Sequence, residues 1–153
     1  MTNTDNKTLA IIDTNVFINA LFGNGMFRND MKILDLEEQG IIRFAFSDST
    51  RNELLLITAR KITEHELYDS VEFFDLLYEI FDRSITINEA NRLEQLSTDK
   101  SDQMFIEAAV EVNANYLITN DTRNGLLELE RYKNVLIWKP DKFIRRMNRR
   151  RVR

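Results

Sequence analysis

Short unbroken apolar runs alternate along the chain with stretches in which apolar residues recur every three or four positions. The two clearest runs span residues 9–12 and 116–119, and weaker ones, rich in β-branched or aromatic residues, span 41–46, 85–87 and 135–138. Runs of this length and composition are typical of buried strands. The sequence therefore predicts five strands.

Helical spacing fills the intervals between these runs. Met31 and Leu34 show it, and Val71, Phe74 and Leu77 show it more clearly. Residues 49–81 are long enough for two consecutive helices, and glycines at 23 and 25 mark a loop after a short first helix. Strands that alternate with helices predict an α/β domain, with a mostly parallel sheet covered by helices on both faces.

Length and composition limit the classes of protein to consider. A chain of 153 residues suits one domain, and the absence of cysteine excludes disulfides, thiolate zinc sites and cysteine nucleophiles. The N-terminus has no basic region followed by an apolar stretch, and no apolar run approaches the roughly 18 residues that a membrane helix requires. We expect a cytoplasmic protein that does not enter the membrane.

The net charge of −4 is unevenly distributed. Six arginines crowd the last nine positions and leave 15 basic residues against 25 acidic ones elsewhere; they are Arg145, Arg146, Arg149, Arg150, Arg151 and Arg153. We divide the chain into a domain at 9–143 and a basic tail at 144–153. A phosphate-binding arm and a solubilising end that contacts an acidic patch explain this tail equally well.

Two aspartates follow the two clearest strands. Asp13 ends the first strand run, and Asp121 comes shortly after the run at 116–119. Ligands of open α/β sheets bind beyond the carboxyl ends of the strands, so both residues occupy a position typical of a site. An aspartate after a strand also commonly caps the next helix, and for either residue alone both interpretations stay open.

Two further acids share predicted helix faces with apolar residues. Glu53 precedes Leu56 and Ile57 by three and four positions, and Asp102 stands in the same relation to Phe105. A carboxylate on a core-facing position needs a partner, and the sequence offers no obvious buried lysine or arginine. The helix dipole is an alternative explanation for Asp102.

A metal site accounts for the four acids together. Oxygen ligands without histidine or cysteine favour a hard cation, Mg²⁺ or Mn²⁺, and such ions commonly serve phosphate chemistry. A bound cation can supply a nucleophilic water and stabilise charge on phosphoryl oxygens, so no histidine base is required. We interpret the only histidine, His65, as a surface residue of a polar helical stretch.

The same residues resemble the PIN-domain family in order and spacing, over about residues 9–143. The likeness rests on the stretches IIDTNV at 11–16, Ser47 to Leu54, DKSD followed by FIEAA at 99–109, and YLITND at 116–121. It implies a three-layer α/β/α domain with a central, mostly parallel five-stranded sheet. It also implies divalent-metal-dependent endonucleolytic cleavage of RNA that leaves 5′-phosphate and 3′-hydroxyl ends.

The resemblance also assigns roles by position. It makes Asp13, Glu53, Asp102 and Asp121 the catalytic, metal-binding acids, supported by Asn15 and Thr119. Asp99 either binds a second metal ion or caps the helix that begins near Ser101, and we favour the cap. Some relatives carry a further acid after the last motif, where this chain has Thr122, Arg123 and Asn124, so one or two metal ions remain possible.

The resemblance leaves the biological role open. Many small PIN proteins are the toxin of a toxin–antitoxin pair, whereas others process RNA without an antitoxin. We expect an RNA substrate, with arginines 145, 146, 149, 150 and 151 as tentative RNA contacts, and a homodimer, because relatives often dimerise. An antitoxin groove and ordinary core packing both explain the apolar residues Leu67, Val71, Phe73, Phe74 and Leu76.

Three other classes compete with this interpretation. A dehalogenase-like phosphatase would need a second aspartate where Asn15 stands, and a receiver domain would need adjacent acids near the first strand. Neither pattern is present. The stronger alternative is a catalytically silent PIN-like module that binds RNA or protein, but retention of all four acids favours the enzyme.

Overall fold

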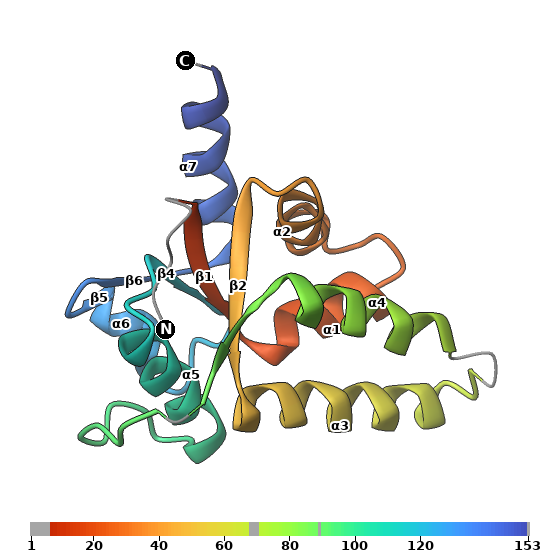
Figure 1. The fold of residues 1–153 in the computed structure, drawn as a ribbon, viewed down its shortest axis with the longest axis horizontal. Helices are drawn as coiled ribbons and strands as arrows, with labels where there is room; N and C mark the ends of the chain where they lie inside the picture. The colour runs from red at the N-terminus through yellow and green to blue at the C-terminus, as the bar shows by residue number, and fades with distance from the viewer. Residues whose placement is uncertain (1–6, 68–70, 89, 153) are drawn as a thin grey trace.

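A central sheet divides the molecule into two helical layers (Figure 1). The computed structural model describes residues 7–67, 71–88 and 90–152, with side chains as far as Arg150. Five strands are parallel and lie in the order β3-β2-β1-β4-β6, and the short β5 joins β6 in antiparallel orientation. Their bounds are β1 (Thr8–Ile12), β2 (Ile42–Ser47), β3 (Ile85–Ile87), β4 (Tyr116–Ile118), β5 (Arg131–Tyr132) and β6 (Val135–Trp138).

The helices lie on both faces of this sheet, as the sequence predicts. They are α1 (Thr14–Phe22), α2 (Arg28–Glu38), α3 (Asp48–Glu64), α4 (Val71–Arg83), α5 (Lys100–Glu111), α6 (Leu126–Leu129) and α7 (Pro140–Val152). No described helix is long and apolar enough to cross a membrane. The predicted α/β architecture, its five parallel strands and the two helices between β2 and β3 are confirmed.

Alternation along the strands creates two cores. In β1, Ala10 and Ile12 pack with residues of α1 to α4 and α7, whereas Leu9 and Ile11 pack with residues of α5 and α6 on the opposite face. Successive side chains of a strand point to opposite faces, so a strand that is apolar at every position becomes buried on both sides. This explains the unbroken apolar run at the start of the chain.

One prediction about α3 is wrong. Leu56 does not face the core, because its side chain is 60% exposed. The buried face of α3 instead carries Thr50, Leu54 and Thr58, each four residues apart. The sequence therefore predicted that Glu53 lies on the core-facing side of α3, but it did so from the spacing to Leu56, which is exposed to solvent.

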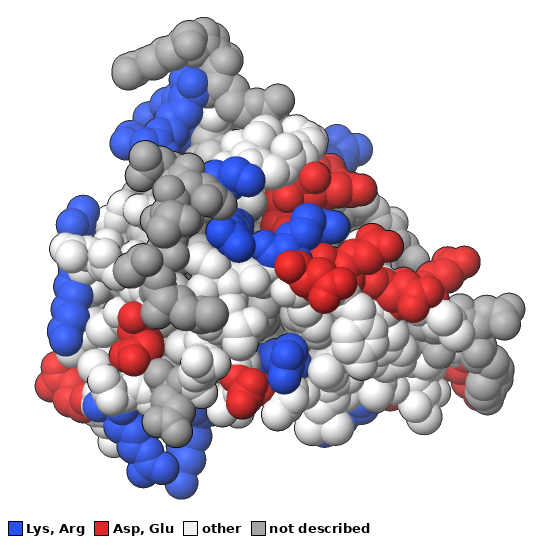
Figure 2. Space-filling model, in the orientation of Figure 1, with Lys and Arg blue, Asp and Glu red and all other residues white. Residues whose placement is uncertain are grey.

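The basic C-terminal segment is helical. The boundary predicted at residue 143 falls inside α7, which buries Phe143, Ile144 and Met147 in the core and packs against α2. The arginines from Arg145 to Arg150 are exposed, and basic side chains follow α7 in Figure 2, whereas acidic ones gather over α2 and α4. The side chain of Arg151 and the whole of Arg153 lie outside the described residues.

Aromatic contacts join the C-terminal end of α1 to the end of α3 and the start of α4. Phe73 stacks on Phe22 of α1 with ring centroids 4.7 Å apart, and Phe22 also stacks on His65 at 6.3 Å. His65 is exposed, as predicted. Among the apolar residues of the hypothetical partner groove, Val71 is 69% exposed. The others, at positions 67, 73, 74 and 76, are half-buried.

Candidate active site

The order of the strands creates a crevice between β1 and β4. The chain leaves β1 towards β2 on one side and later returns to form β4 on the other. This change of direction is the topological switch point at which open α/β sheets bind ligands. Asp13 directly follows β1 here, and its backbone N–H donates to the carbonyl of Ile118 at 2.9 Å.

Thr119 links the two aspartates of the crevice. Its hydroxyl donates to Oδ2 of Asp13 at 2.7 Å and accepts from the backbone N–H of Asp121 at 3.1 Å. Asn15 contributes its backbone N–H to Oδ1 of Asp13 at 3.3 Å, while its side chain lines an adjacent depression. Asp13 is only 4% exposed, so these donors stabilise a carboxylate that water hardly reaches.

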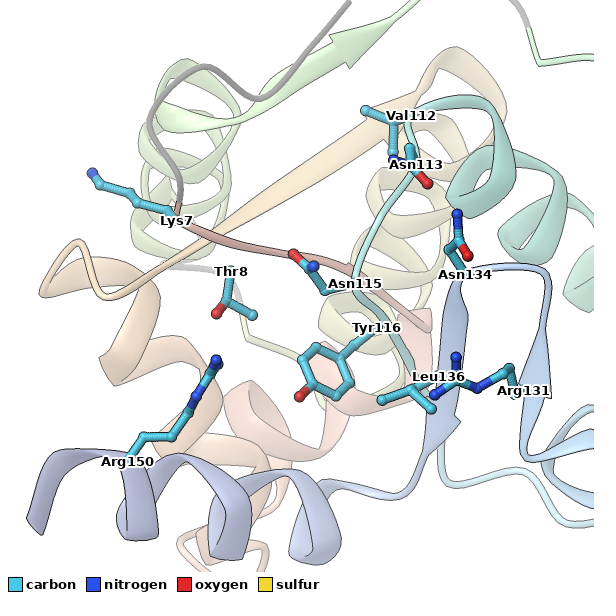
Figure 3. Close-up of a pocket in the computed structure, with 10 residues that line it drawn as sticks. All are labelled: Lys7, Thr8, Val112, Asn113, Asn115, Tyr116, Arg131, Asn134, Leu136 and Arg150. Atoms are coloured by element: carbon cyan, nitrogen blue, oxygen red, sulfur yellow. The ribbon is translucent and has the colours of Figure 1, made fainter. Parts of the chain in front are cut away.

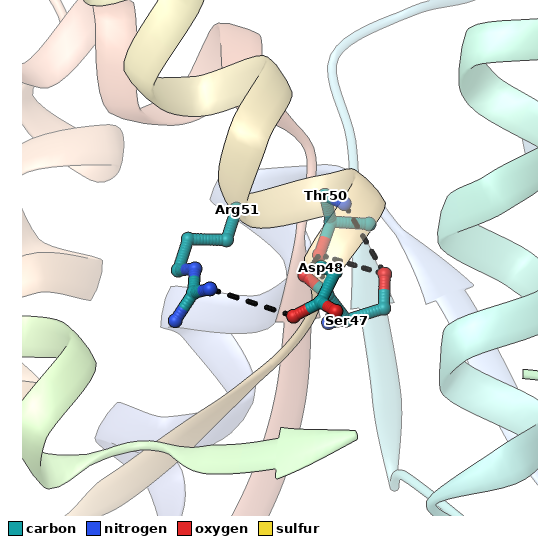
Figure 4. A network of polar contacts seen from close by, with 4 residues as sticks. All are labelled: Ser47, Asp48, Thr50 and Arg51. Carbon is teal, nitrogen blue, oxygen red and sulfur yellow. Dashed lines mark hydrogen bonds and ion pairs between the residues drawn. The ribbon is translucent and has the colours of Figure 1, made fainter. Parts of the chain in front are cut away.

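A capping box at the start of α3 positions Glu53 (Figure 4). The hydroxyl of Ser47 accepts from the backbone N–H of Thr50 at 3.2 Å, and the Thr50 hydroxyl accepts from the backbone N–H of Ser47 at 3.0 Å. These bonds fix the direction in which α3 leaves β2. Glu53 follows within the next turn, and its Oε2 is buried without a hydrogen-bond partner among the described residues.

Asp102 approaches from the first turn of α5 and is 8% exposed. Its Oδ2 accepts from the side-chain amide of Asn124 at 2.7 Å. Asp99 caps the same helix, because its Oδ1 accepts from the backbone N–H of Ser101 at 2.8 Å. The predicted cap is thereby confirmed, and both acids stand at the start of α5.

Burial and mutual repulsion raise the pKa of three of these acids. Burial, followed by the charges of Asp13 and Asp102, raises the pKa of Glu53 to about 7. Burial also raises the pKa of Asp102 to about 6 against the hydrogen bond from Asn124. The pKa of Asp13 is raised by burial, with Asp121 adding to the effect and Thr119 opposing it. Carboxylates from four separate elements therefore sense one another.

These residues suit a hard cation. In the described part of the chain, no three acids already converge on a point that could hold an ion. Protein donors occupy oxygens of Asp13, Asp102 and Asp121 instead. Among the described residues, however, none donates to the buried Oε2 of Glu53, and the raised pKa of this acid reflects its burial first and the charges of neighbouring acids second. An oxygen-only donor set of this kind suits a hard divalent cation by its chemistry.

An open depression of about 480 Å³ adjoins the acids. Asp99 and Asp121 contribute carboxylates to it, while Asn15, Asn120 and Arg123 contribute amide and guanidinium groups. Such a lining can donate hydrogen bonds to phosphate and to base edges. A polar chain lying in this depression would pass directly beside the acidic crevice.

The structure adds site residues that the sequence did not suggest. Asp30, 4% exposed on α2, accepts at Oδ2 from the amides of Asn19 at 3.0 Å and Asn120 at 2.9 Å. It thereby fixes the loop that carries Asp121. No periodicity connects residues 90 positions apart. The sequence contained a weak indication for Asn124, because this residue stands in the region where some relatives carry a further acid. In the structure, its side-chain amide holds Asp102.

A family model and a solved structure match this chain. The sequence model of the PIN domain matches residues 10–123. A chain in the crystal structure of VapBC2 from Rickettsia felis, bound to a DNA fragment from their promoter, has the same fold, with a TM-score of 0.54 at 17% identity. The similarity covers 86% of this chain and 98% of that one. No curated protein sequence matches.

The cost of keeping Glu53 charged in the folded protein can be tested by measuring the melting temperature at different pH values. Folding raises its pKa from 4.5 to about 7, so the folded state holds this proton more tightly and loses stability as pH rises through that window. In EDTA at pH 8, we expect Glu53→Gln to raise the melting temperature by roughly 2–4 °C, the change that about 1 kcal/mol, discounted for solvent access, produces in such a domain. The gain should vanish near pH 4.

Two controls sharpen this measurement. Glu64→Gln changes an exposed residue at the far end of α3 and should leave the melting temperature nearly unchanged at both pH values. Mn²⁺ should stabilise the wild-type protein more than Glu53→Gln. A variant less stable than wild type at pH 8 in EDTA would show that Glu53 is not under repulsion.

Proposed function

Because the chain belongs to the PIN-domain family, we propose that it is a divalent-metal-dependent endoribonuclease that hydrolyses phosphodiester bonds in RNA. PIN domains are generally nucleases. The observation that carries the proposal is the gathering of four acids near the switch point. Burial and neighbouring charges raise the pKa of Asp13, Glu53 and Asp102, and a buried Glu53 oxygen has no partner among the described residues.

In this proposal, Asp13, Glu53, Asp102 and Asp121 hold Mg²⁺ or Mn²⁺. The bound ion would supply an activated water and stabilise charge on the phosphoryl oxygens. The protein supplies fixed geometry. The Thr119 hydroxyl orients Asp13 and, through its second contact, the backbone of Asp121.

Asn124 serves Asp102 in the same way. Its amide holds Oδ2 of Asp102, while its own Oδ1 accepts from the backbone N–H of Leu126 at 2.9 Å. Asn124 is 2% exposed, so its orientation is fixed by burial. Asp102 therefore needs little reorganisation when the ion binds, which favours catalysis.

The adjoining depression is suited to a single RNA strand. It is open, and asparagine amides and Arg123 lie beside Asp121. Unpaired bases present hydrogen-bonding edges that such amides can contact, whereas the edges of a paired helix are largely enclosed. The substrate we propose is therefore single-stranded RNA, or a loop.

Loss of one acid should separate catalysis from folding. We expect Asp13→Asn to reduce Mn²⁺-dependent cleavage of a labelled mixed-sequence RNA by at least about 100-fold, because Asp13 is a proposed ion ligand. Asp35→Asn, at an exposed position of α2, is the matched control and should cleave normally. The melting temperature of each variant reports the fold.

Three outcomes are distinguishable. Cleavage that EDTA and Asp13→Asn both abolish supports the proposal. Cleavage at the wild-type rate by Asp13→Asn means that the assigned site is wrong. If clean wild-type protein binds RNA but cuts none of a varied set with either ion, the chain is the catalytically silent module.

We also propose that arginines of α7 contact RNA, Arg145, Arg146 and Arg149 among them. The helix begins just after β6, at the sheet edge that carries the acids, and its arginines are exposed. Arg145 lines a depression that also includes Trp138, Lys142 and Thr122, which is the residue after Asp121. A basic helix face that starts at the acidic crevice would attract the phosphates of a bound strand.

Salt dependence tests this contact without disturbing the core. Changing Arg145, Arg146 and Arg149 to Gln should weaken RNA binding and reduce the slope of log K against log salt by about 2, because each phosphate contact on a single strand contributes about 0.7. Substitution is preferable to deletion, since Met147 of the same helix is buried. Arg60→Gln on α3 is the control. An unchanged slope would make these arginines solubilising residues only.

The biological role that we propose is that of a toxin in a toxin–antitoxin pair. Two observations support this role. The chain has the length of a single domain, and it shares its fold with a chain of VapBC2, of which the similarity covers 98%. A homodimer and an antitoxin partner would accompany that role.

Growth measurements test it. Induced expression of the wild-type protein should arrest bacterial growth, whereas Asp13→Asn at equal abundance should not. Normal growth with wild-type protein that cleaves RNA after purification would exclude the toxin role and favour RNA processing.

A further inference from the structure

A further depression, of about 560 Å³ (Figure 3), lies at the opposite edge of the sheet from the acids. Its floor is formed by Thr8, Tyr116 and Leu136, which lie at or near the starts of β1, β4 and β6. Tyr116 and Leu136 are paired in register, as are Ile118 and Trp138 at the other end of the same strands. The depression is therefore a separate place from the acidic crevice.

The lining of this depression is cationic. Arg131 belongs to β5 and Arg150 to α7, so two elements distant in sequence each contribute a guanidinium group. Lys7 lines the depression with its chain, but its ammonium group lies near Gly40 and points away (Figure 3). No aspartate or glutamate is among the described residues that line the depression. The whole chain carries a net charge of −4, so two arginines without a described acid are a local reversal of charge.

Neutral hydrogen-bonding groups complete the lining. Asn113 and Asn134 are exposed and contribute side-chain amides from two different loops. Figure 3 shows the Tyr116 hydroxyl directed towards α7, from which the Arg150 guanidinium reaches in. Guanidinium groups bind phosphate through two parallel hydrogen bonds, and amides and hydroxyls pair with sugar or base atoms.

We propose that this depression binds a nucleotide-sized phosphate ester, with Arg150 on the phosphate, and with Arg131 and the asparagine amides on the nucleoside at the other side of Tyr116. Its volume falls within the range of small-molecule sites. The phosphate is distinct from the one cleaved in the proposed reaction, because β4 separates the two edges by roughly 10 Å between Tyr116 and Thr119.

Two sources could provide this chemistry. One is a free nucleotide. The other is a terminal nucleotide of an RNA strand that crosses the molecule along α7, since this helix starts beside the acidic edge and carries Arg150 at the opposite edge. The inference does not depend on the ribonuclease proposal, because binding can be measured without cleavage.

Calorimetric titration tests the site. The full chain is titrated in EDTA at low salt with 5′-AMP, with adenosine and with inorganic phosphate. We expect 5′-AMP to bind saturably and more tightly than adenosine. The Arg131→Gln, Arg150→Gln double variant should bind it about tenfold or more weakly, because charge-assisted hydrogen bonds to phosphate are lost. Arg60→Gln is the control, since this exposed arginine of α3 does not line the depression, and it should bind as wild type does.

A further arm distinguishes the two sources. A short 5′-phosphorylated oligoribonucleotide stays uncut in EDTA if cleavage requires the ion. Binding tighter than that of 5′-AMP, and weakened by the double variant, identifies a strand terminus; equal binding identifies a free nucleotide. Both outcomes support the site. Absence of saturable 5′-AMP binding, or equal binding by wild type and the double variant, overturns it.

Discussion

The buried carboxylate of Asp13 is the constraint on which the rest of the site depends. It lies where two neighbouring parallel strands end, and at 4% exposure water can do little to stabilise its charge. Thr119 and the backbone of Asn15 supply the hydrogen bonds that make this burial tolerable. These hydrogen-bond donors carry no positive charge. The negative charge of the crevice is therefore not balanced by them, and a bound cation would balance it.

Helices α3 and α5 bring further carboxylates to the crevice and fix their positions. The Ser47 capping box sets the direction of α3, and Asp99 caps α5. Glu53 and Asp102 are thereby brought within electrostatic reach of Asp13 and of each other. Regions that raise the pKa of several acids at once are commonly functional, because such crowding lowers stability without improving packing.

Helix α7 connects the core with both edges of the sheet. One side buries Phe143, Ile144 and Met147, so the helix is part of the folded domain, and the other presents arginines to solvent. Because the helix follows β6 and then runs back across the sheet, its arginines extend from the acidic edge towards the depression lined by Arg131 and Arg150. Near its start, Asp141 pairs with Arg145, so the arginines further along the helix carry most of its unpaired positive charge.

The sequence by itself determined the five parallel strands, most helices and the positions of Asp13 and Asp121 after β1 and β4, because period and strand-end position are local properties that a few neighbouring residues encode. It missed the short β5. It predicted a core-facing Glu53, whose Oε2 is buried, although Leu56, on which that prediction relied, is exposed. Only the tertiary structure decided that Asp30 holds Asn120, that Asn124 holds Asp102, and that Lys7, Arg131 and Arg150 share one depression. These contacts depend on strand order and helix packing, which join residues far apart in the chain and leave no trace in local spacing.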